Sequence, residues 1–463
     1  MKKLTLLFLI MLVPALIFAG GKQEKAKPTG PQTVTITVWA RANNVEHWRA
    51  DAAVEAAKLL NAELKKEGKN ITVVVKADYS NPPWGEYKKK FTMAADAGEA
   101  PDIICSGHED VPVWAQAGYI MPIANSVSEV QSMYPEFADV IPSLWHSTEW
   151  HGKIWAVPQD TEARPMFFSK TKLKQLGWTD QQIKELPEKI KNGEFTLDDM
   201  IKTAQEAIKK GVVPPGYGYW HRPRKGGDFL QYYVSYGGYL YDPKQDKLVL
   251  VKDALLKWYQ FQRRCVTTGI TPKNFIGTEW KIWHDTVSHN KVLFWNGGIW
   301  QWADWKVNYL NGDENFLFKN VGYALQPSGI RGKKGNTLSH PLVYMVTTEK
   351  ACGHKYRDLV IRLLAKMSTK EINTKHAVES THLGILKSQM HYKPYTDSKF
   401  LANVTYMLNY NWYQPNNPSY SMWFDIVWNG MVAAENGEKT PQQAVDSVVK
   451  QMKLELGDAV IIK

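Results

Sequence analysis

Residues 100–107 read APDIICSG, and residues 117–122 follow as AGYIMP. Further along, residues 151–158 read HGKIWAVP, and residues 166–170 read MFFSK. The first pair predicts a buried strand that stops at a polar, glycine-containing corner. The second pair predicts a strand that enters the polar segment 159–164, QDTEAR, and returns as another strand. Both stretches therefore place polar side chains at strand ends, where α/β proteins bind their ligands.

The sequence before these stretches alternates strand and helix patterns. The predicted order is strand 33–39, helix 46–67, strand 71–77, helix 84–97 and a strand that begins at residue 103. This order is typical of the first half of a doubly wound α/β lobe. The carboxyl ends of such strands share one edge of the sheet, so Arg41, His108 and Glu109 are predicted to lie on one rim.

The later sequence predicts further helices and strands. The predicted helices are 173–211 with a cap at Thr196, 255–267, 355–368 and 440–454, and the predicted strands are 290–297, 321–327 and 342–347. We expect the last two strands to lead back into the first lobe.

The N-terminus has the pattern of an export signal. Lys2 and Lys3 precede an apolar run over residues 4–18, and small residues follow at 19–21. The run is shorter than the roughly 20 residues of a membrane span, so we expect a cleaved signal peptide, 1–19, over the alternative of a retained anchor. Residues 20–31 predict a flexible leader. No cysteine follows the cleavage site, which predicts a periplasmic protein without a lipid anchor.

Composition excludes several classes of protein. Three cysteines, Cys105, Cys265 and Cys352, are too few for a disulfide scaffold; buried free thiols are favoured, and one bridge stays open. The net charge is +11, but the lysines are scattered along expected helix faces. This distribution predicts a solvated surface and no nucleic-acid partner.

The chain offers no sign of catalytic chemistry. It lacks the GxSxG, HExxH and phosphate-loop patterns, and HSTEWH at 146–151 has one residue too many for an inverted zinc motif. We therefore expect a protein that is not an enzyme and has no metal or cofactor. A glycosidase pair of carboxylates leaves no sequence signature, so an exported carbohydrate-active hydrolase remains the alternative.

Five segments in order resemble one known family. Besides the two opening stretches, these are NKVLF at 290–294, VGYALQP at 321–327 and GEKTPQQAV at 437–445. They resemble the solute-binding proteins of ABC importers, in the carbohydrate-binding branch that includes maltose-binding protein. The resemblance implies a type II periplasmic-binding-protein fold, with two α/β lobes, a hinge and a ligand cleft between the lobes. The implied crossings are 107–112, 322–328 and 355–362, with an N-lobe of 32–108 plus 326–358 and a C-lobe of 109–325 plus 359–463.

Tryptophan is unusually frequent, with 19 in the chain and six between residues 280 and 305. An indole is an apolar plate with a polar edge, which suits the face of a sugar ring. By resemblance, the turn Asn296-Gly297 precedes an aromatic residue that stacks on ligand. One residue is inserted here, which leaves Trp300 and Trp302 as alternatives. A second stacking aromatic is Trp423 or Phe424.

The polar segment 159–164 supplies the charged groups. By resemblance, Glu162 matches an acidic position that hydrogen-bonds sugar hydroxyls. In an extended chain Asp160 and Arg164 share its face. A carboxylate accepts from two neighbouring hydroxyls and a guanidinium donates to two, although a salt bridge between these residues is the alternative.

These observations combine into one functional hypothesis. We expect an exported, monomeric binding protein that captures a sugar or small polyol, such as a mono- or disaccharide or a cyclitol, by hinge closure and delivers it to a membrane permease. A binding protein for a peptide or polyamine is a further alternative. The predicted ligand-binding residues are Arg41, Trp84, His108, Glu109, Asp160, Glu162, Arg164, His221, Asn296, Gly297, Trp300, His340 and Trp423.

Overall fold

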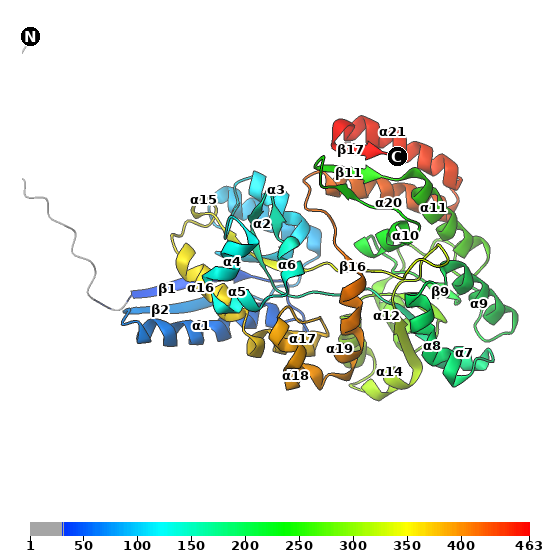
Figure 1. Cartoon of the computed structure of the whole chain (residues 1–463), viewed down its shortest axis with the longest axis horizontal. Coiled ribbons are helices and arrows are strands. Elements are labelled where there is room, and N and C mark those ends of the chain that lie inside the picture. The colour runs from blue at the N-terminus through cyan, green and yellow to red at the C-terminus, as the bar shows by residue number, and fades with distance from the viewer. Residues whose placement is uncertain (1–29, 31) are drawn as a thin grey trace, which may run out of the picture.

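The computed structural model describes residue 30 and residues 32–463. The predicted signal peptide and all but one residue of the predicted leader lie outside the described residues. Two lobes lie side by side along the long axis of the molecule (Figure 1). We call them the N-lobe and the C-lobe. Among the described residues, no helix is long and apolar enough to cross a membrane.

A six-stranded mixed sheet forms the centre of the N-lobe. Its strands are β1 (Gln32–Trp39), β2 (Ile71–Asp78), β3 (Ile103–Gly107), β4 (Ile120–Met121), β7 (Ala156–Pro158) and β15 (Leu342–Thr347). The order is β2-β1-β3-β15-β4, and β7 also pairs with β15. The strands β1, β2 and β3 are parallel, whereas β15 is antiparallel to its three partners. The predicted strands at 33–39, 71–77 and 342–347 are thereby confirmed.

Helices and short strands complete the N-lobe. They are α1 (Trp48–Lys66), α2 (Trp84–Ala97), α3 (Val111–Gln116), α4 (Val127–Met133), α5 (Pro135–Asp139), α6 (Pro142–His146), β5 (Glu149–Trp150), β6 (Lys153–Ile154), α15 (Glu349–Cys352), α16 (Arg357–Met367) and α17 (Lys370–Ser380). Helix α2 ends at Gly98, which takes the left-handed conformation and terminates the helix as expected. The predicted helices 46–67 and 84–97 are therefore confirmed.

The C-lobe contains two smaller sheets. Its strands are β8 (Met166–Ser169), β9 (Tyr219–Trp220), β10 (Tyr241–Asp242), β11 (Lys247–Leu250), β12 (Phe294–Asn296), β13 (Val321–Ala324) and β17 (Val460–Ile462). One sheet has the order β13-β8-β12-β9 and the other β10-β11-β17. The predicted strand that re-enters at residue 166 is β8, which lies at the centre of the first sheet.

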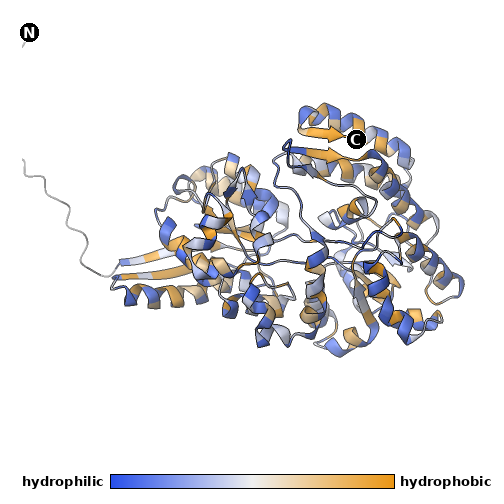
Figure 2. Cartoon of the chain, in the orientation of Figure 1, coloured by the Kyte–Doolittle hydropathy of each residue, from blue (hydrophilic) through white to orange (hydrophobic). Residues whose placement is uncertain are grey.

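Most C-lobe residues are helical. The helices are α7 (Lys170–Gln175), α8 (Asp180–Lys191), α9 (Leu197–Lys209), α10 (Leu230–Ser235), α11 (Lys252–Thr267), α12 (Trp280–Ser288), α13 (Gln301–Asp304), α14 (Glu314–Asn320), α18 (Lys393–Thr396), α19 (Lys399–Val404), α20 (Tyr420–Asn436) and α21 (Pro441–Glu455). Thr196 caps α9 as predicted, in a capping box with Asp199. Figure 2 shows apolar strands inside each lobe and hydrophilic turns outside, in agreement with separate cores.

The predicted lobe boundaries are wrong in two places. Residues 111–158 belong to the N-lobe, because β4 and β7 both pair with β15. Residues 359–380 also belong there, because α16 and α17 both pack on α1. Both assignments depend on contacts with elements far away in the sequence, which local patterns do not reveal.

The chain crosses between the lobes at residues 159–165, 325–341 and 381–392. Of the predicted crossings, only that at 322–328 is close to an observed one. A short strand pair, β14 (Thr337–Leu338) with β16 (Asn411–Trp412), lies between the lobes. We call the region where these segments meet the junction.

Candidate functional site

Two guanidinium groups and two carboxylates meet at the junction. Nε of Arg164 donates to Oε1 of Glu162 at 2.7 Å, and Nη1 donates to Oδ1 of Asp228 at 2.8 Å. Nη1 of Arg222 donates to the same oxygen of Asp228 at 2.8 Å. We call these four residues the charge cluster. Three of them are under 10% exposed, so their interactions are only weakly screened by water.

The crossing segments hold the charge cluster in place. The backbone N–H of Arg164 donates to Oγ1 of Thr337 at 2.7 Å, and the hydroxyls of Thr161 and Ser339 lie 2.6 Å apart. These contacts join the first crossing to the second.

The burial of the charge cluster affects its ionisable and polar atoms. Burial raises the pKa of Glu162 despite the neighbouring Arg164. Buried polar atoms normally have partners, yet Oδ2 of Asp228 and Nε of Arg222 have none among the described residues.

Two half-buried indoles flank the charge cluster. The guanidinium carbon of Arg164 lies 5.0 Å from the ring centroid of Trp300, and that of Arg222 lies 5.6 Å from it. Arg222 also lies 4.8 Å from the ring centroid of Trp280. The Trp300 ring stacks on His382, with 5.8 Å between centroids. The junction thus combines apolar plates with paired donors and acceptors, the chemistry that a polyhydroxylated ring offers in return.

The turn before Trp300 explains why glycine stands there. A Cβ on Gly298 would lie 1.9 Å from the Trp300 ring, so the indole requires glycine beneath it. Asn296 is fully buried and donates to Oε1 of Gln326 at 3.2 Å. The N–H of Gly297 donates to the carbonyl of Pro165. Asn296 and Gly297 therefore support the turn that carries Trp300, and Trp300 itself faces the junction.

Most of the tryptophan cluster belongs to the C-lobe core. Trp283, Trp295, Trp302 and Trp305 are each 0% exposed. The Trp302 indole stacks on Phe400 at 4.2 Å and donates to Glu314. Of the two alternatives left by the sequence, Trp300 is the one at the junction.

A second polar group lies where β3 ends. Nε2 of His340 lies 2.7 Å from Oε2 of Glu109, and the Lys88 ammonium lies 3.0 Å from Oε1. Nδ1 of His108 donates to Oδ1 of Asn416 at 2.8 Å, while its Nε2 has no partner among the described residues. As predicted, His108 and Glu109 share one rim, and they contact the segments that pass between the lobes.

The pKa values of His108 and His340 are shifted in opposite directions. Burial, together with the neighbouring His340, lowers the pKa of His108 to about 4, so its imidazole is neutral. Burial opposes the charge of His340, but the Glu109 carboxylate outweighs burial and raises its pKa. His108 therefore offers an acceptor at Nε2, whereas His340 is paired with the Glu109 carboxylate.

Arg41 and Trp84 form a separate pair on the N-lobe. The guanidinium carbon lies 4.4 Å from the Trp84 centroid, and Nε donates to the carbonyl of Pro82 at 2.6 Å. Both side chains are half-buried. Nearby, Asn44 donates to Asn308 of the C-lobe at 2.7 Å, so this face of the N-lobe touches the opposite lobe.

The Asp160 carboxylate is bound by other groups of the protein. Oδ1 accepts from the backbone N–H of Leu342 at 3.0 Å, and Oδ2 contacts Arg49 and His376, each at 3.2 Å. Burial opposes ionisation, but His382, His376 and Arg49 hold the pKa of Asp160 well below its usual range. Its oxygens are occupied within the protein by groups other than Arg164. The salt-bridge alternative for Arg164 is observed with Glu162.

Two predicted ligand residues, His221 and Trp423, lie in the C-lobe core and not at the junction. Nε2 of His221 lies 3.1 Å from Glu435 and Nδ1 donates to the carbonyl of Arg222; the residue is 1% exposed. Trp423 is 0% exposed and packs on Tyr233 and Tyr420. Trp423 lies on the buried face of α20, which the resemblance to the family did not reveal.

The model of the family described as bacterial extracellular solute-binding protein matches residues 50–371. The chain belongs to that family. The predicted family and the α/β periplasmic-binding-protein fold are thereby confirmed. Membership also supports the expectation of a binding protein over an enzyme.

Individual relatives are distant. The diacetylchitobiose binding protein DasA of Streptomyces coelicolor is 24% identical over 227 residues, which span 49% of this chain and 45% of that relative. The GacH receptor of Streptomyces glaucescens is 21% identical, with a TM-score of 0.71 over 91% of this chain and 98% of GacH. Maltose-bound MalE3 of T. maritima is 17% identical, with a TM-score of 0.69 over 91% of this chain and 99% of MalE3.

Proposed function

We propose that this protein captures a neutral sugar or small polyol at the junction and delivers it to the permease of an ABC importer. The observation that carries the proposal is the charge cluster between the indoles of Trp280 and Trp300. Guanidinium and carboxylate groups form bidentate hydrogen bonds with vicinal hydroxyls. The indoles provide apolar surface for the C–H face of the ring.

The charge balance of the junction favours a neutral solute. Two guanidiniums and two carboxylates cancel within the charge cluster. A polyamine would have to approach the positive charges of Arg164 and Arg222. Both carboxylates of the charge cluster are already paired with these guanidiniums and would not compensate for the repulsion. A peptide would bring charged termini, whereas a sugar adds only hydroxyls. The named relatives agree with this preference, since one is a diacetylchitobiose binding protein and another is a maltose-bound protein.

Capture proceeds by closure of one lobe against the other. The crossings at 159–165 and 325–341 carry Arg164 and His340, so movement at the crossings repositions the ligand groups directly. Closure removes water from the junction, which strengthens every polar contact there. The permease then binds the closed form in preference to the open form. The mature chain acts as a periplasmic monomer.

Thermal unfolding against a panel of solutes tests this function. Residues 20–463 are heated with mono- and disaccharides, cyclitols, uronates, peptides and polyamines. A ligand that binds only the folded state adds about 2.7 kcal/mol at a hundred times its dissociation constant. We expect stabilisation by one saccharide or polyol, recovered unchanged. Stabilisation only by amines or peptides would overturn the carbohydrate assignment, and conversion of the compound would favour the hydrolase alternative.

A further inference from the structure

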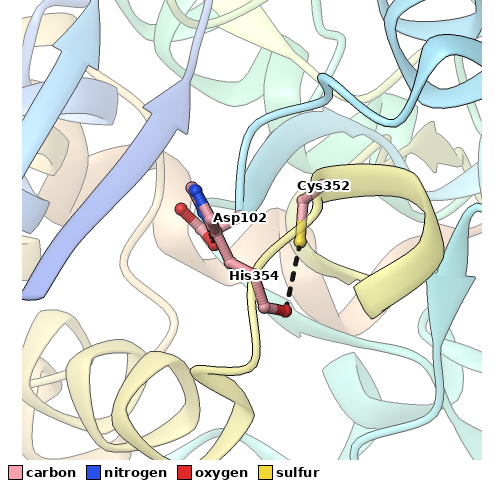
Figure 3. A group of neighbouring side chains, drawn as sticks. All are labelled: Asp102, Cys352 and His354. Carbon is pink, nitrogen blue, oxygen red and sulfur yellow. Dashed lines mark hydrogen bonds and ion pairs between the residues drawn. The ribbon is translucent and has the colours of Figure 1, made fainter. Parts of the chain in front are cut away.

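A further polar group lies on the N-lobe, away from the charge cluster and from His108 and Glu109. Within the described residues, three groups of metal-ligating side chains have their donor atoms within 4.8 Å of one another, and one of them is Asp102, Cys352 and His354. Figure 3 shows the His354 imidazole against the Asp102 carboxylate, with Cys352 facing them from the end of α15. We call these three residues the Cys–His–Asp group.

The other two groups already contain a cation. In the group of Asp160, His376 and His382, the Arg49 guanidinium lies 3.2 Å from both Asp160 and His382. In the group of His108, Glu109 and His340, the Glu109 carboxylate holds the ammonium of Lys88. A metal ion would have to displace or approach these fixed positive charges, which is unfavourable at short range.

The Cys–His–Asp group has no such obstacle. Oδ2 of Asp102 accepts from the backbone N–H and the hydroxyl of Thr37, each at 2.7 Å. Oδ1 lies 2.8 Å from Nδ1 of His354. Across the described part of the chain, no lysine or arginine forms an ion pair with Asp102. The Asp102 carboxylate is thus fixed from one side and presents its other oxygen to His354.

Local backbone geometry brings the other two donors together. Helix α15 ends at Cys352, and Gly353 follows with φ of +74°. This left-handed residue reverses the chain, so His354 returns towards the Asp102 carboxylate. Sγ of Cys352 lies 3.7 Å from the carbonyl oxygen of His354, a weak contact.

We propose that Asp102 Oδ1, Cys352 Sγ and His354 Nδ1 bind a divalent transition-metal ion of the zinc class. Thiolate, imidazole and carboxylate are the ligands that zinc takes in proteins, at roughly 2.0–2.3 Å. A tetrahedral ion then holds its ligands about 3.5 Å apart. Asp102 Oδ1 and His354 Nδ1 now lie 2.8 Å apart, and all three donor atoms lie within 4.8 Å of one another, so metal binding requires only a small rearrangement of the three side chains. Coordination releases the thiol proton to solvent and leaves the imidazole proton on Nε2.

The fourth position of the ion faces solvent. A cavity of about 550 Å³ lies beside Cys352 and His354 and reaches Trp39. The His354 side chain is 38% exposed, which gives an entry path. Three protein ligands with an open position are typical of zinc sites that keep a water. Burial raises the pKa of the Cys352 thiol, but the charge of a bound cation deprotonates a coordinating thiol.

The experiment uses the mature protein without a histidine tag, stripped with a chelator and dialysed against Zn²⁺ or Co²⁺. We expect about one equivalent of metal and a thiolate-to-cobalt charge-transfer band. Cys352→Ser should remove the band, and His354→Ala should weaken Zn²⁺ binding at least tenfold. Cys265→Ala, which alters a buried cysteine of the C-lobe, is the matched control and should keep both signals.

Three outcomes would overturn the proposal. They are no metal above background in the wild-type protein, a charge-transfer band that survives Cys352→Ser, and equal loss of metal in Cys265→Ala. Because His354 is partly exposed, His354→Ala keeps the test valid if Cys352→Ser folds poorly. Saccharide binding is measured on the same samples and should be unaffected, so this proposal and the proposed function can fail separately.

Discussion

Arg164 and Asp228 join the first crossing to a short 3-10 helix of the C-lobe, Gly227–Phe229, with 2.8 Å between Nη1 and Oδ1. The bond matters because Arg164 also holds Glu162, so one guanidinium organises two carboxylates. A charged group buried in this way keeps its orientation. We regard this pairing as the reason that the junction presents a fixed pattern of donors and acceptors.

The planar fork of Arg164 should be essential for affinity. Arg164→Lys keeps the charge but loses bidentate geometry, so we expect at least a tenfold weaker saccharide affinity in calorimetry. Arg331→Lys alters an exposed arginine paired with Asp199 and should leave affinity unchanged. Equal affinity of the wild type and Arg164→Lys would contradict a direct role.

Trp300 and Trp302 should respond in opposite ways to truncation. Trp302 is in the core, so Trp302→Ala should cost roughly 3–5 kcal/mol of unfolding free energy. Trp300→Ala should cost less stability and abolish saccharide binding. Urea unfolding and calorimetry on both variants check this, and a Trp300→Ala protein that binds normally would refute the stacking assignment.

Gly298 offers an indirect way to move the Trp300 indole. A Cβ at this position collides with the ring, so Gly298→Ala should weaken binding without removing a polar contact. Gly85→Ala, in α2 with no atom within 4 Å of the added Cβ, is the matched control and should bind normally. An unchanged affinity for Gly298→Ala would mean that the indole position is irrelevant to binding.

Asp160 and Glu162 should separate stability from binding. Asp160→Asn unbalances a buried ion-pair network and should cost roughly 3–5 kcal/mol while affinity persists. Glu162→Gln should weaken affinity with a smaller effect on stability. Denaturant unfolding measures the stability, and calorimetry measures the saccharide affinity. Loss of affinity in a folded Asp160→Asn protein would show that Asp160 contributes to binding.

His108 should make the protein sensitive to acid. The folded pKa of His108 is about 4, lowered from 6.5. The unfolded chain therefore binds a proton first, and stability falls as pH drops from about 6.5 to 4, by roughly 3 kcal/mol. His108→Asn should reduce that loss in denaturant unfolding at a series of pH values. An identical pH profile in the variant would show that His108 does not contribute.

Local structure could be predicted well from the sequence because it depends on neighbouring residues. The pattern of α2 and its glycine cap lie within residues 84–98, and β15 is a continuous apolar run. The lobe boundaries could not be predicted, because β4 and β7 pair with β15, which is far away in the sequence.

The candidate site was predicted in part for the same reason. Glu162, Arg164 and Trp300 lie in segments that resemble the family, and the structure brings them together at the junction. Asp228 was missed because it lies outside the five segments that resemble the family. Its only signal was the neighbouring Arg222. Trp423 was misplaced because the resemblance implied an aromatic residue that faces ligand, whereas Trp423 lies on the buried face of α20.

Calorimetric titration of the mature protein with the saccharide or polyol that stabilises it most tests the central claim most directly. We predict one binding site per chain, with the ligand recovered unchanged and with binding lost in Trp300→Ala but retained in Asp160→Asn. Binding that survives both Trp300→Ala and Arg164→Lys would place the ligand elsewhere and contradict the account.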